Sequence, residues 1–176
     1  NGENKSGFSS GTSELEIIDL GCGDGTLTVE MAKFATSVIG VDFNPDMLAS
    51  ARQRIDRLGL QNVKLLAEDA GNLSLPAESL DVVFFSQSLH HLDNPQRGFQ
   101  EAARILRPGG KVLVMELATH SEEWVLEKLG HKWLGFEKET LHDFMHTAGF
   151  SNLYSQILPF RREELFQIIL AAGSKT

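Results

Sequence analysis

The stretch from Glu16 to Gly25 constrains the fold more than any other part of the chain. It reads Glu-Ile-Ile-Asp-Leu-Gly-Cys-Gly-Asp-Gly, a short apolar strand that leads directly into three glycines spaced two residues apart. Gly21, Gly23 and Gly25 have no Cβ, so the backbone can pass close beneath a ligand at the end of a buried strand. A glycine-rich turn with a purely structural duty is the alternative interpretation.

A second strand, Val-Ile-Gly-Val, ends in an acidic residue, Asp42. An acid at the tip of the strand next to a glycine loop can accept hydrogen bonds from both hydroxyl groups of a ribose. Taken alone, Asp42 or the later Asp69 could equally be a turn or helix-start carboxylate. Their joint placement after two strands favours a nucleoside-binding crevice at the carboxyl ends of parallel strands.

The rest of the chain alternates between apolar segments and helical patterns. Helices are expected after Gly25 (with Leu27, Met31, Phe34 and Ala35 inward), from Asn44-Pro45 to Gly59 (with Leu58 in its buried stripe), after Asn94-Pro95, and around 141–148. Strands are expected at about 37–42, 62–67, 80–85, 111–117, 152–158 and 165–172. The last two strands are separated only by residues 159–164, a connection that can join only antiparallel neighbours. The sequence therefore predicts an α/β fold with a mostly parallel sheet and one reversed strand near its edge.

Composition narrows the function. The chain has 176 residues, 41% of them hydrophobic, which fits one domain, expected at 14–176 behind a flexible Gly/Ser-rich tail at 1–13. A net charge of −8 argues against nucleic acid or an anionic membrane as a partner. We find neither a membrane-spanning apolar run nor a signal peptide and expect a cytoplasmic location. The chain begins at Asn1 rather than methionine, and we expect it to be part of a longer protein.

Several motifs, in order, resemble those of class I S-adenosylmethionine-dependent methyltransferases, specifically the methyltransferase type 11 group. They are Asp19-Leu-Gly-Cys-Gly-Asp-Gly25, Val41-Asp42-Phe-Asn-Pro-Asp-Met-Leu48, Asp69, Leu80-Asp-Val-Val83 leading to His90-His91, and Leu106-Arg-Pro-Gly-Gly110. The resemblance implies a Rossmann-like seven-stranded sheet with an antiparallel seventh strand and helices on both faces. It also implies S-adenosylmethionine as cofactor and, in our interpretation, an unidentified small-molecule methyl acceptor.

Residues 117–150 are similar to methyltransferase domains fused to winged-helix regulators of the arsenic-repressor type. No winged helix exists in this sequence, so the resemblance assigns no DNA binding to this chain. Only residues 1–15 precede the first strand, so we expect the crevice either to be unusually open or to be covered by a missing N-terminal domain or by a second subunit in a homodimer. Arsenic is a disfavoured acceptor, because trivalent arsenic is normally held by several thiolates and Cys22 is the single cysteine.

The resemblance also implies roles for individual residues. The glycine loop would approach the methionine part of the cofactor, Asp42 would bind the ribose, Phe43 and Met47 would pack on the adenine, and Asp69 would accept from its amine. Met47 is equally well explained as a core residue of its helix. The full set of expected cofactor-binding residues is Asp19, Gly21, Cys22, Gly23, Asp42, Phe43, Met47, Asp69, Ala70, Ser86 and Gln87.

Catalytic residues are harder to identify from the sequence than binding residues. A methyl group on a positively charged sulfur is already activated, so a general base is optional. His91, His90 and Glu116 follow predicted strands and are the candidates for such a base. No metal site is predicted. His142 and His146 have helical zinc-ligand spacing, but no third ligand for them is evident. The group His90-His91-Leu-Asp93 is interpreted as shaping the lip of the crevice rather than as binding zinc.

Two other functions remain open at this level. A nicotinamide-dependent oxidoreductase would use a similar strand, loop and acidic tip, although position 26 is threonine where its glycine pattern needs a third glycine. A sensor module would bind the cofactor without turning it over. Residues 118–136, which include Trp124, Trp133, Leu134 and Phe136, are expected to cover the crevice, with completion of the core as the alternative.

Overall fold

The structure is a computed structural model that describes residues 14–159 and 165–176. The tail expected at 1–13 lies outside the described residues. The strands are β1 (Glu16–Leu20), β2 (Ser37–Val41), β3 (Val63–Leu66), β4 (Leu80–Ser86), β5 (Leu106–Leu117), β6 (Phe150–Ile157) and β7 (Ile168–Lys175). The helices are α1 (Thr26–Met31), α2 (Pro45–Leu58), the 3-10 turn η1 (Leu89–His91), α3 (Pro95–Ile105), α4 (Trp124–Lys128) and α5 (Lys138–Thr147).

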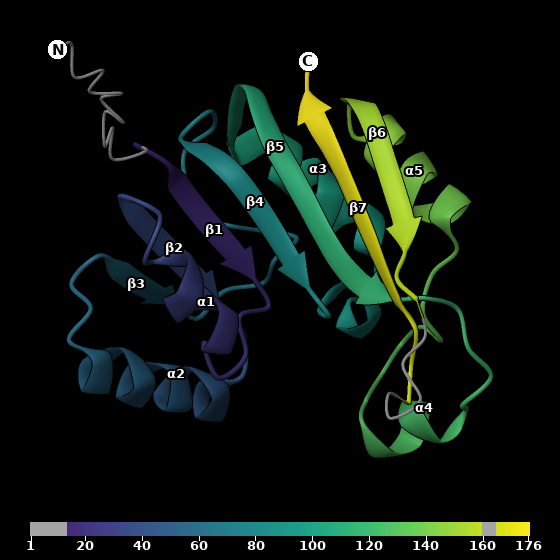
Figure 1. Cartoon of the computed structure of the whole chain (residues 1–176), viewed down its shortest axis with the longest axis horizontal. Coiled ribbons are helices and arrows are strands. Elements are labelled where there is room, and N and C mark those ends of the chain that lie inside the picture. Colours follow the sequence, from purple (N-terminus) through teal and green to yellow (C-terminus); the bar gives the residue numbers. More distant parts are fainter. Residues whose placement is uncertain (1–13, 160–164) are drawn as a thin grey trace, which may run out of the picture.

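The seven strands form one sheet in the order β3-β2-β1-β4-β5-β7-β6 (Figure 1). Neighbouring strands are parallel except at β7, which is antiparallel to both β5 and β6. The expected Rossmann-like sheet with a reversed seventh strand is therefore confirmed. The strand order reverses between β1 and β4, which is where ligands bind in open α/β sheets, outside the carboxyl ends of the strands.

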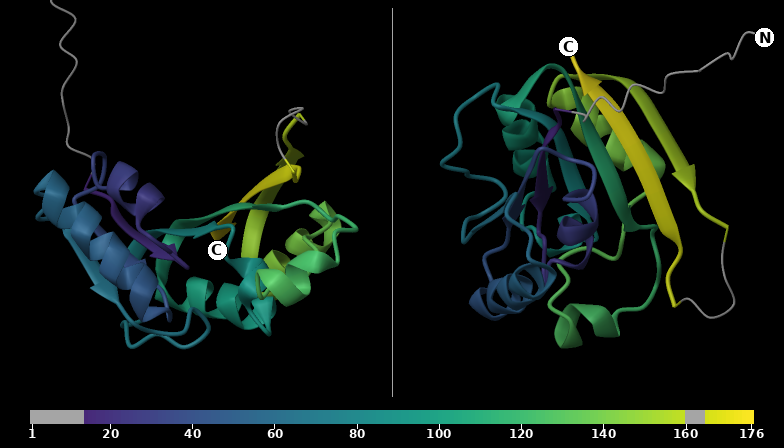
Figure 2. Two further views of the ribbon diagram at one scale, coloured as in Figure 1. Left: turned by 90° about the horizontal axis from the view of Figure 1, so that it is seen from below. Right: turned by 60° about the vertical axis from the view of Figure 1, so that its left-hand side comes forward.

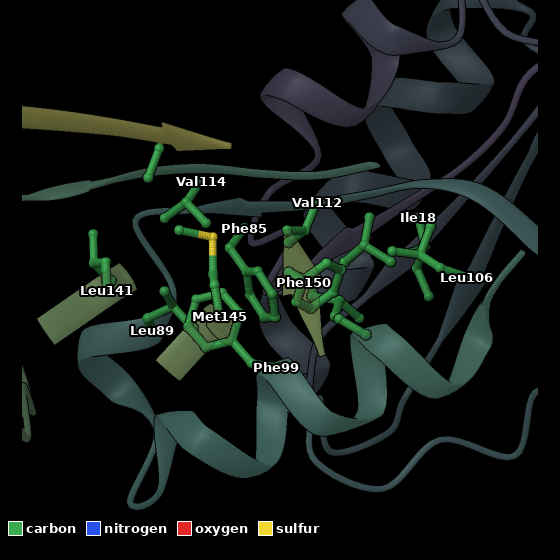
Figure 3. Packing of buried hydrophobic residues seen from close by; sticks show 14 of the residues in the cluster. Ile18, Phe85, Leu89, Phe99, Leu106, Val112, Val114, Leu141, Met145 and Phe150 are labelled. Carbon is green, nitrogen blue, oxygen red and sulfur yellow. The ribbon is translucent and has the colours of Figure 1, made fainter. Parts of the chain in front are cut away.

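Helices cover both faces of the sheet. Figure 2 (left panel) shows α1 on one face and α3 with α5 on the other. Between α3 and the sheet, Phe85, Phe99 and Met145 are fully buried and lie in one continuous core (Figure 3). Among the described residues, no helix has both the length and the apolar character needed to cross a membrane.

Helix α2 shows how local sequence sets an element's ends. The Asn44 side chain accepts hydrogen bonds from the backbone N–H groups of Asp46 and Met47, Pro45 occupies the first turn, and Gly59 ends the helix at φ 64°. Asp42 is placed just before this cap, so the cap also fixes the backbone next to the carboxylate.

Three details differ from the sequence-based expectation. Phe34 was expected to face the core but is 74% exposed, because α1 ends at Met31 and the chain turns outward before Phe34. Leu58, in the last turn of α2, is also largely exposed. Strand β5 begins at Leu106 rather than Lys111, since Leu106 already pairs with Leu80 of β4; the register then shifts before Lys111 pairs with Val82, and Gly109 lies between them at φ 81°.

Candidate functional site

The glycine loop between β1 and α1 forms the centre of the site. All three of its glycines have positive φ angles, between 54° and 79°, which side-chain-bearing residues rarely adopt. Their surroundings differ. A Cβ on Gly21 would lie 2.3 Å from Ser88 Cβ, whereas a Cβ on Gly23 would meet no atom of residues 14–159 or 165–176 within 4 Å. Gly21 thus allows close packing against the end of β4, and Gly23 leaves open space above the loop.

Asp42 joins this loop to the tip of β2. Its Oδ2 accepts a hydrogen bond from the Gly23 N–H at 2.9 Å, and its Oδ1 accepts from the Asn44 N–H at 2.8 Å. The carboxylate is half-buried, and each oxygen retains a second lone-pair direction. The structure therefore brings together Gly23 and Asp42, the two features that predicted a nucleoside crevice, and fixes the carboxylate in one orientation.

Asp19 lies beneath the loop with 1% of its surface exposed. Its Oδ2 accepts a hydrogen bond of 2.6 Å from the Thr28 hydroxyl, while Oδ1 is buried without a partner among the described residues. The net effect of its surroundings raises the pKa of Asp19 to about 6. Burial is the largest cause of the increase, the charge of Asp42 adds to it, and the hydrogen bond from Thr28 opposes it. The unpartnered oxygen is suited to a donor or cation that the chain itself does not supply.

The raised pKa of Asp19 predicts a pH-dependent stability. The protonated form is favoured in the folded chain, so its stabilising contribution is complete below about pH 3.8 and is lost as pH rises through about 6. Between pH 5 and 7 the wild type should lose roughly 1 kcal/mol of unfolding free energy relative to Asp19→Asn. Urea unfolding at both pH values measures this difference. The same change at the exposed Asp56 is the control, and parallel profiles for wild type and Asp19→Asn would contradict the prediction.

Cys22 contributes its backbone to the loop rather than its thiol. The side chain is buried, and its Sγ lies 3.1 Å from where a Cβ on Gly40 would be, beneath the loop. Burial, followed by the negative charges of Asp19 and Asp42, raises the pKa of the thiol to about 12. The thiol is therefore protonated at neutral pH, which argues against a nucleophilic role.

The residues expected around the adenine lie on the open side of the site. Phe43 is 73% exposed and Met47 is 40% exposed, although both are apolar. Met47 is therefore not the core residue that the alternative interpretation of its helix required. Asp69 is exposed, and its Oδ1 accepts from the Gly71 N–H at 2.8 Å in a short turn that also contains the half-buried Ala70.

The end of β4 closes the site from the other side. Ser86 is the last residue of β4, and Gln87 adopts φ 49°, an uncommon conformation for a residue with a side chain. Ser88 follows, and its hydroxyl donates to the Leu20 carbonyl at 2.6 Å. Ser88 was missed from sequence, because nothing in its local pattern shows that it packs against Gly21.

The three candidate catalytic residues occupy one small region beyond Ser88. Glu116 is fully buried, and its Oε1 lies 2.6 Å from Nδ1 of the buried His90. The Glu116 oxygens also accept from the backbone N–H groups of Leu89, His90 and Leu117. Glu116 therefore orients His90 and has no free access to a substrate. The His91 residue is exposed at the surface, but one side of its ring packs against the protein; this desolvation, followed by the charge of His90, lowers the pKa of His91.

A third histidine, His131, joins His90 and His91 from the segment after α4. The ring centroids lie 4.1 Å (His90–His131), 4.3 Å (His90–His91) and 5.0 Å (His91–His131) apart. His131 is 8% exposed, and burial, together with the neighbouring histidines, lowers its pKa to about 4. Sequence analysis missed His131 because it lies forty residues from its partners and carries no local motif.

Part of the segment 118–136 completes the core, and part of it stays exposed where it could cover the crevice. Phe136 is 2% exposed, and the Trp133 ring stacks on it with centroids 5.6 Å apart, so both complete the core. Trp124, Leu126 and Leu129 are 40–49% exposed on and after α4, which lies below the arrowhead of β5 in Figure 1. Only this outer part remains available as a substrate wall or partner surface.

Comparison with known proteins places this geometry in a family. Residues 18–114 match the family model described as "Methyltransferase domain". The chain is 33% identical over 103 residues to demethylmenaquinone methyltransferase of Clavibacter sepedonicus, and 34% identical over 100 residues to phosphatidylethanolamine N-methyltransferase of Cereibacter sphaeroides. These matches cover 58% and 56% of this chain, and 41% and 49% of the two relatives, so the chain spans less than half of each relative's length.

The fold is shared with a solved methyltransferase structure. The phosphoethanolamine N-methyltransferase 2 of Haemonchus contortus, in complex with phosphomonomethylethanolamine and S-adenosylhomocysteine, superimposes with a TM-score of 0.79 at 19% identity. The superposition covers 96% of this chain and 50% of that one. Since the family model spans more than half of the chain, including the end of β1, the glycine loop, Asp42 and β4, this chain belongs to the methyltransferase domain family.

Proposed function

We propose that this chain is an S-adenosylmethionine-dependent methyltransferase that transfers a methyl group to a small-molecule acceptor. The observation that carries the proposal is the pairing of Gly23 with Asp42. The Asp42 carboxylate is fixed by two backbone N–H groups at the edge of the open space above Gly23. This arrangement suits the ribose of a nucleoside, because hydroxyl groups donate strongly to an ionised carboxylate.

Three further features fit S-adenosylmethionine rather than an arbitrary nucleoside. The buried Oδ1 of Asp19 has no partner among the described residues and suits the cationic amino acid end of the molecule. The exposed Phe43 and Met47 supply an apolar wall for the adenine. The open space at Gly23 leaves room for the part of S-adenosylmethionine that joins its amino acid end to its adenine.

The cofactor supplies a methyl group that its positively charged sulfur has already activated. The protein residues bind and orient. Asp42 would hold the ribose, Asp69 would accept from the adenine amine beside Ala70, and Ser86 and Gln87 would lie near the amino group. The remaining requirement is to align the acceptor behind the methyl group and exclude water.

A proton must leave when the acceptor is a hydroxyl or a protonated amine. The free Nε2 of His90 suits this step, since Glu116 accepts at Nδ1 and leaves a lone pair on the other ring nitrogen. His91, which is exposed at the mouth of the same region, is the second candidate. Glu116 is a positioning residue for His90 because it is fully buried.

The acceptor class follows from the relatives and from charge. The two relatives described above are named for methyl transfer to a demethylmenaquinone and to phosphatidylethanolamine. A net charge of −8 disfavours a polyanionic acceptor such as nucleic acid. We infer a small molecule with an apolar part, which would contact the exposed side chains of α4.

The resemblance of residues 117–150 to domains behind arsenic-repressor-type winged-helix regulators leads to a further part of the proposal. A domain of that kind, or a second subunit, would cover the crevice. Size-exclusion chromatography with light scattering tests the second subunit directly. We also propose a cytoplasmic location.

The two glycines of the loop should respond differently to alanine. In Gly23→Ala the added methyl enters the open space, so cofactor affinity should fall at least tenfold with a stability loss of about 1 kcal/mol from the φ of 54°. In Gly21→Ala the methyl collides with Ser88, so the fold should be destabilised more. Calorimetric titration and thermal unfolding of both variants measure the two effects. Unchanged cofactor affinity in Gly23→Ala would show that the glycine is structural.

Separate titrations with S-adenosylmethionine and NAD distinguish the ligand classes. We expect binding of the first and of its demethylated product, and none of the second. A methyl-transfer assay against quinols, phenols and amines then separates an enzyme from a cofactor sensor. Tight binding without turnover of any acceptor would favour the sensor, and NAD binding alone would overturn the proposal.

A further inference from the structure

We propose that His90, His91 and His131 form a binding site for a divalent transition metal of the zinc class. One ring nitrogen from each of the three residues lies within 4.8 Å of the other two. A tetrahedral zinc ion with bonds of about 2.1 Å separates its nitrogen ligands by about 3.4 Å. Modest rotations of the rings would therefore close the site around an ion without moving the backbone.

His90 is already oriented as a metal ligand. Its Nδ1 lies 2.6 Å from Oε1 of Glu116, and three backbone N–H groups hold that carboxylate in place. A hydrogen bond to a carboxylate keeps the proton on Nδ1 and leaves the Nε2 lone pair free to bind a metal. Metal-binding histidines nearly always have such a carboxylate or carbonyl partner on the other nitrogen.

His131 shows an unmet bonding requirement. The side chain is more than nine-tenths buried, and its Nδ1 has no hydrogen-bond partner in the described part of the chain. A buried polar atom without a partner is unfavourable, and each instance in a folded protein calls for an explanation such as an ion. A bound metal would give the His131 imidazole the partner that the chain does not.

The backbone holds His131 against the other two residues. The N–H groups of Lys132 and Trp133 donate to the His90 carbonyl at 2.7 and 3.3 Å, and the His131 N–H donates to the Val125 carbonyl at 3.3 Å. The segment after α4 is thus tied directly to η1. The approach of the three imidazoles is a consequence of this backbone pairing rather than of chance side-chain placement.

His91 supplies the adjustable ligand. Its ring is exposed, and its Nδ1 makes only a long contact of 3.5 Å to the Gly130 carbonyl. The ring can therefore turn toward His90 and His131 without breaking a strong interaction. Its exposure also keeps the site open to solvent on one side, so that an ion can enter.

The ligand set determines the class of metal. Imidazole nitrogens suit zinc, copper, iron and nickel, whereas magnesium and calcium prefer oxygen ligands. Three protein ligands leave one tetrahedral position open, as in catalytic rather than structural zinc sites. That position would take an anionic oxygen or sulfur of a small molecule, and the ion would stabilise its deprotonated form.

The open coordination position of the proposed metal ion would lie near the proposed methyltransferase site. Both η1 and Glu116 lie at the carboxyl ends of β4 and β5, the same end of the sheet as the glycine loop and Asp42. An acceptor bound to the ion would lie on the acceptor side of the proposed methyltransferase site. The ion would then take over the deprotonation that His90 or His91 would perform in the metal-free chain. Metal binding itself does not depend on the proposed function.

The test is metal binding by the full chain after treatment with a chelator, in the absence of cofactor. Titration with zinc chloride by calorimetry should give one ion per chain, and cobalt(II) should give the intense visible absorption of a four-coordinate site. His91→Ala and His131→Ala should each weaken zinc binding at least 100-fold. Glu116→Gln should weaken it 10- to 100-fold by releasing the orientation of His90.

The exposed His146 on α5 provides the matched control, and His146→Ala should bind zinc as the wild type does. His91→Ala guards against a folding artefact, since His91 is exposed and its loss leaves the buried pair of His90 and Glu116 intact. Absence of zinc binding, or binding that survives both His91→Ala and His131→Ala, overturns the site. Because no methyl transfer is measured, these outcomes are independent of those that test the methyltransferase assignment.

Discussion

Replacing Asp42 by alanine is expected to weaken the binding of S-adenosylmethionine by on the order of 2–4 kcal/mol, the largest effect on affinity of any single change in the site. Two losses combine. The ribose hydroxyls lose a charged acceptor, and the N–H groups of Gly23 and Asn44 lose the oxygens that now hold them. Isothermal titration calorimetry at neutral pH measures the difference directly.

Asp42→Asn separates these two contributions. The amide keeps one oxygen for a backbone N–H but removes the negative charge, so we expect an intermediate loss of affinity. Asp56→Ala, at an exposed position of the same α2 helix, is the matched control and should bind the cofactor normally. Wild-type affinity in Asp42→Ala would remove the basis for placing the ribose at β2.

Glu116→Ala is expected to lower the free energy of unfolding by about 3–5 kcal/mol, the largest stability effect that the structure predicts. The Glu116 side chain has no exposed surface, and it accepts hydrogen bonds from three backbone N–H groups besides contacting His90. Removing the carboxylate leaves these buried donors unsatisfied and leaves a cavity at the end of β5. Urea unfolding followed by circular dichroism measures the loss.

Glu116→Gln keeps the shape of the side chain and one acceptor oxygen, so its loss of stability should be about half as large. Glu123→Ala, an exposed glutamate just before α4, should leave the unfolding free energy within about 0.5 kcal/mol of the wild type. A loss below about 1 kcal/mol in Glu116→Ala would mean that water replaces the carboxylate, and His90 would then not be rigidly held.

Local patterns in the chain were informative wherever function depends on the backbone or on residues close in sequence. The strand, the glycine loop and the acid at the tip of β2 could be predicted because strand periodicity, missing Cβ atoms and parallel topology are visible in order along the chain. The reversed β7 followed from the short connection before it. The prediction that Phe34 faces the core was wrong because α1 is only six residues long, too short for helical spacing to decide which side chains are buried.

The site beyond the glycine loop depended on contacts between distant segments. Sequence alone placed His90, His91 and Glu116 after strands, but only the packing of β5 against η1 shows that Glu116 is buried beneath His90. His131 reaches the same place because backbone hydrogen bonds attach its segment to the His90 carbonyl. Likewise, Trp133 entered the core whereas Trp124 stayed exposed, although both are tryptophans in the same loop.

The amino-acid sequence by itself therefore determined the fold class and the proximity of the glycine loop to the carboxylate at the tip of β2. These features arise from short-range rules of strand period, turn conformation and chain connection. Tertiary structure alone decided that Glu116 is buried, that Trp133 packs into the core while Trp124 stays exposed, and that three histidines converge. Such properties depend on burial and on long-range backbone pairing, and a linear pattern contains neither.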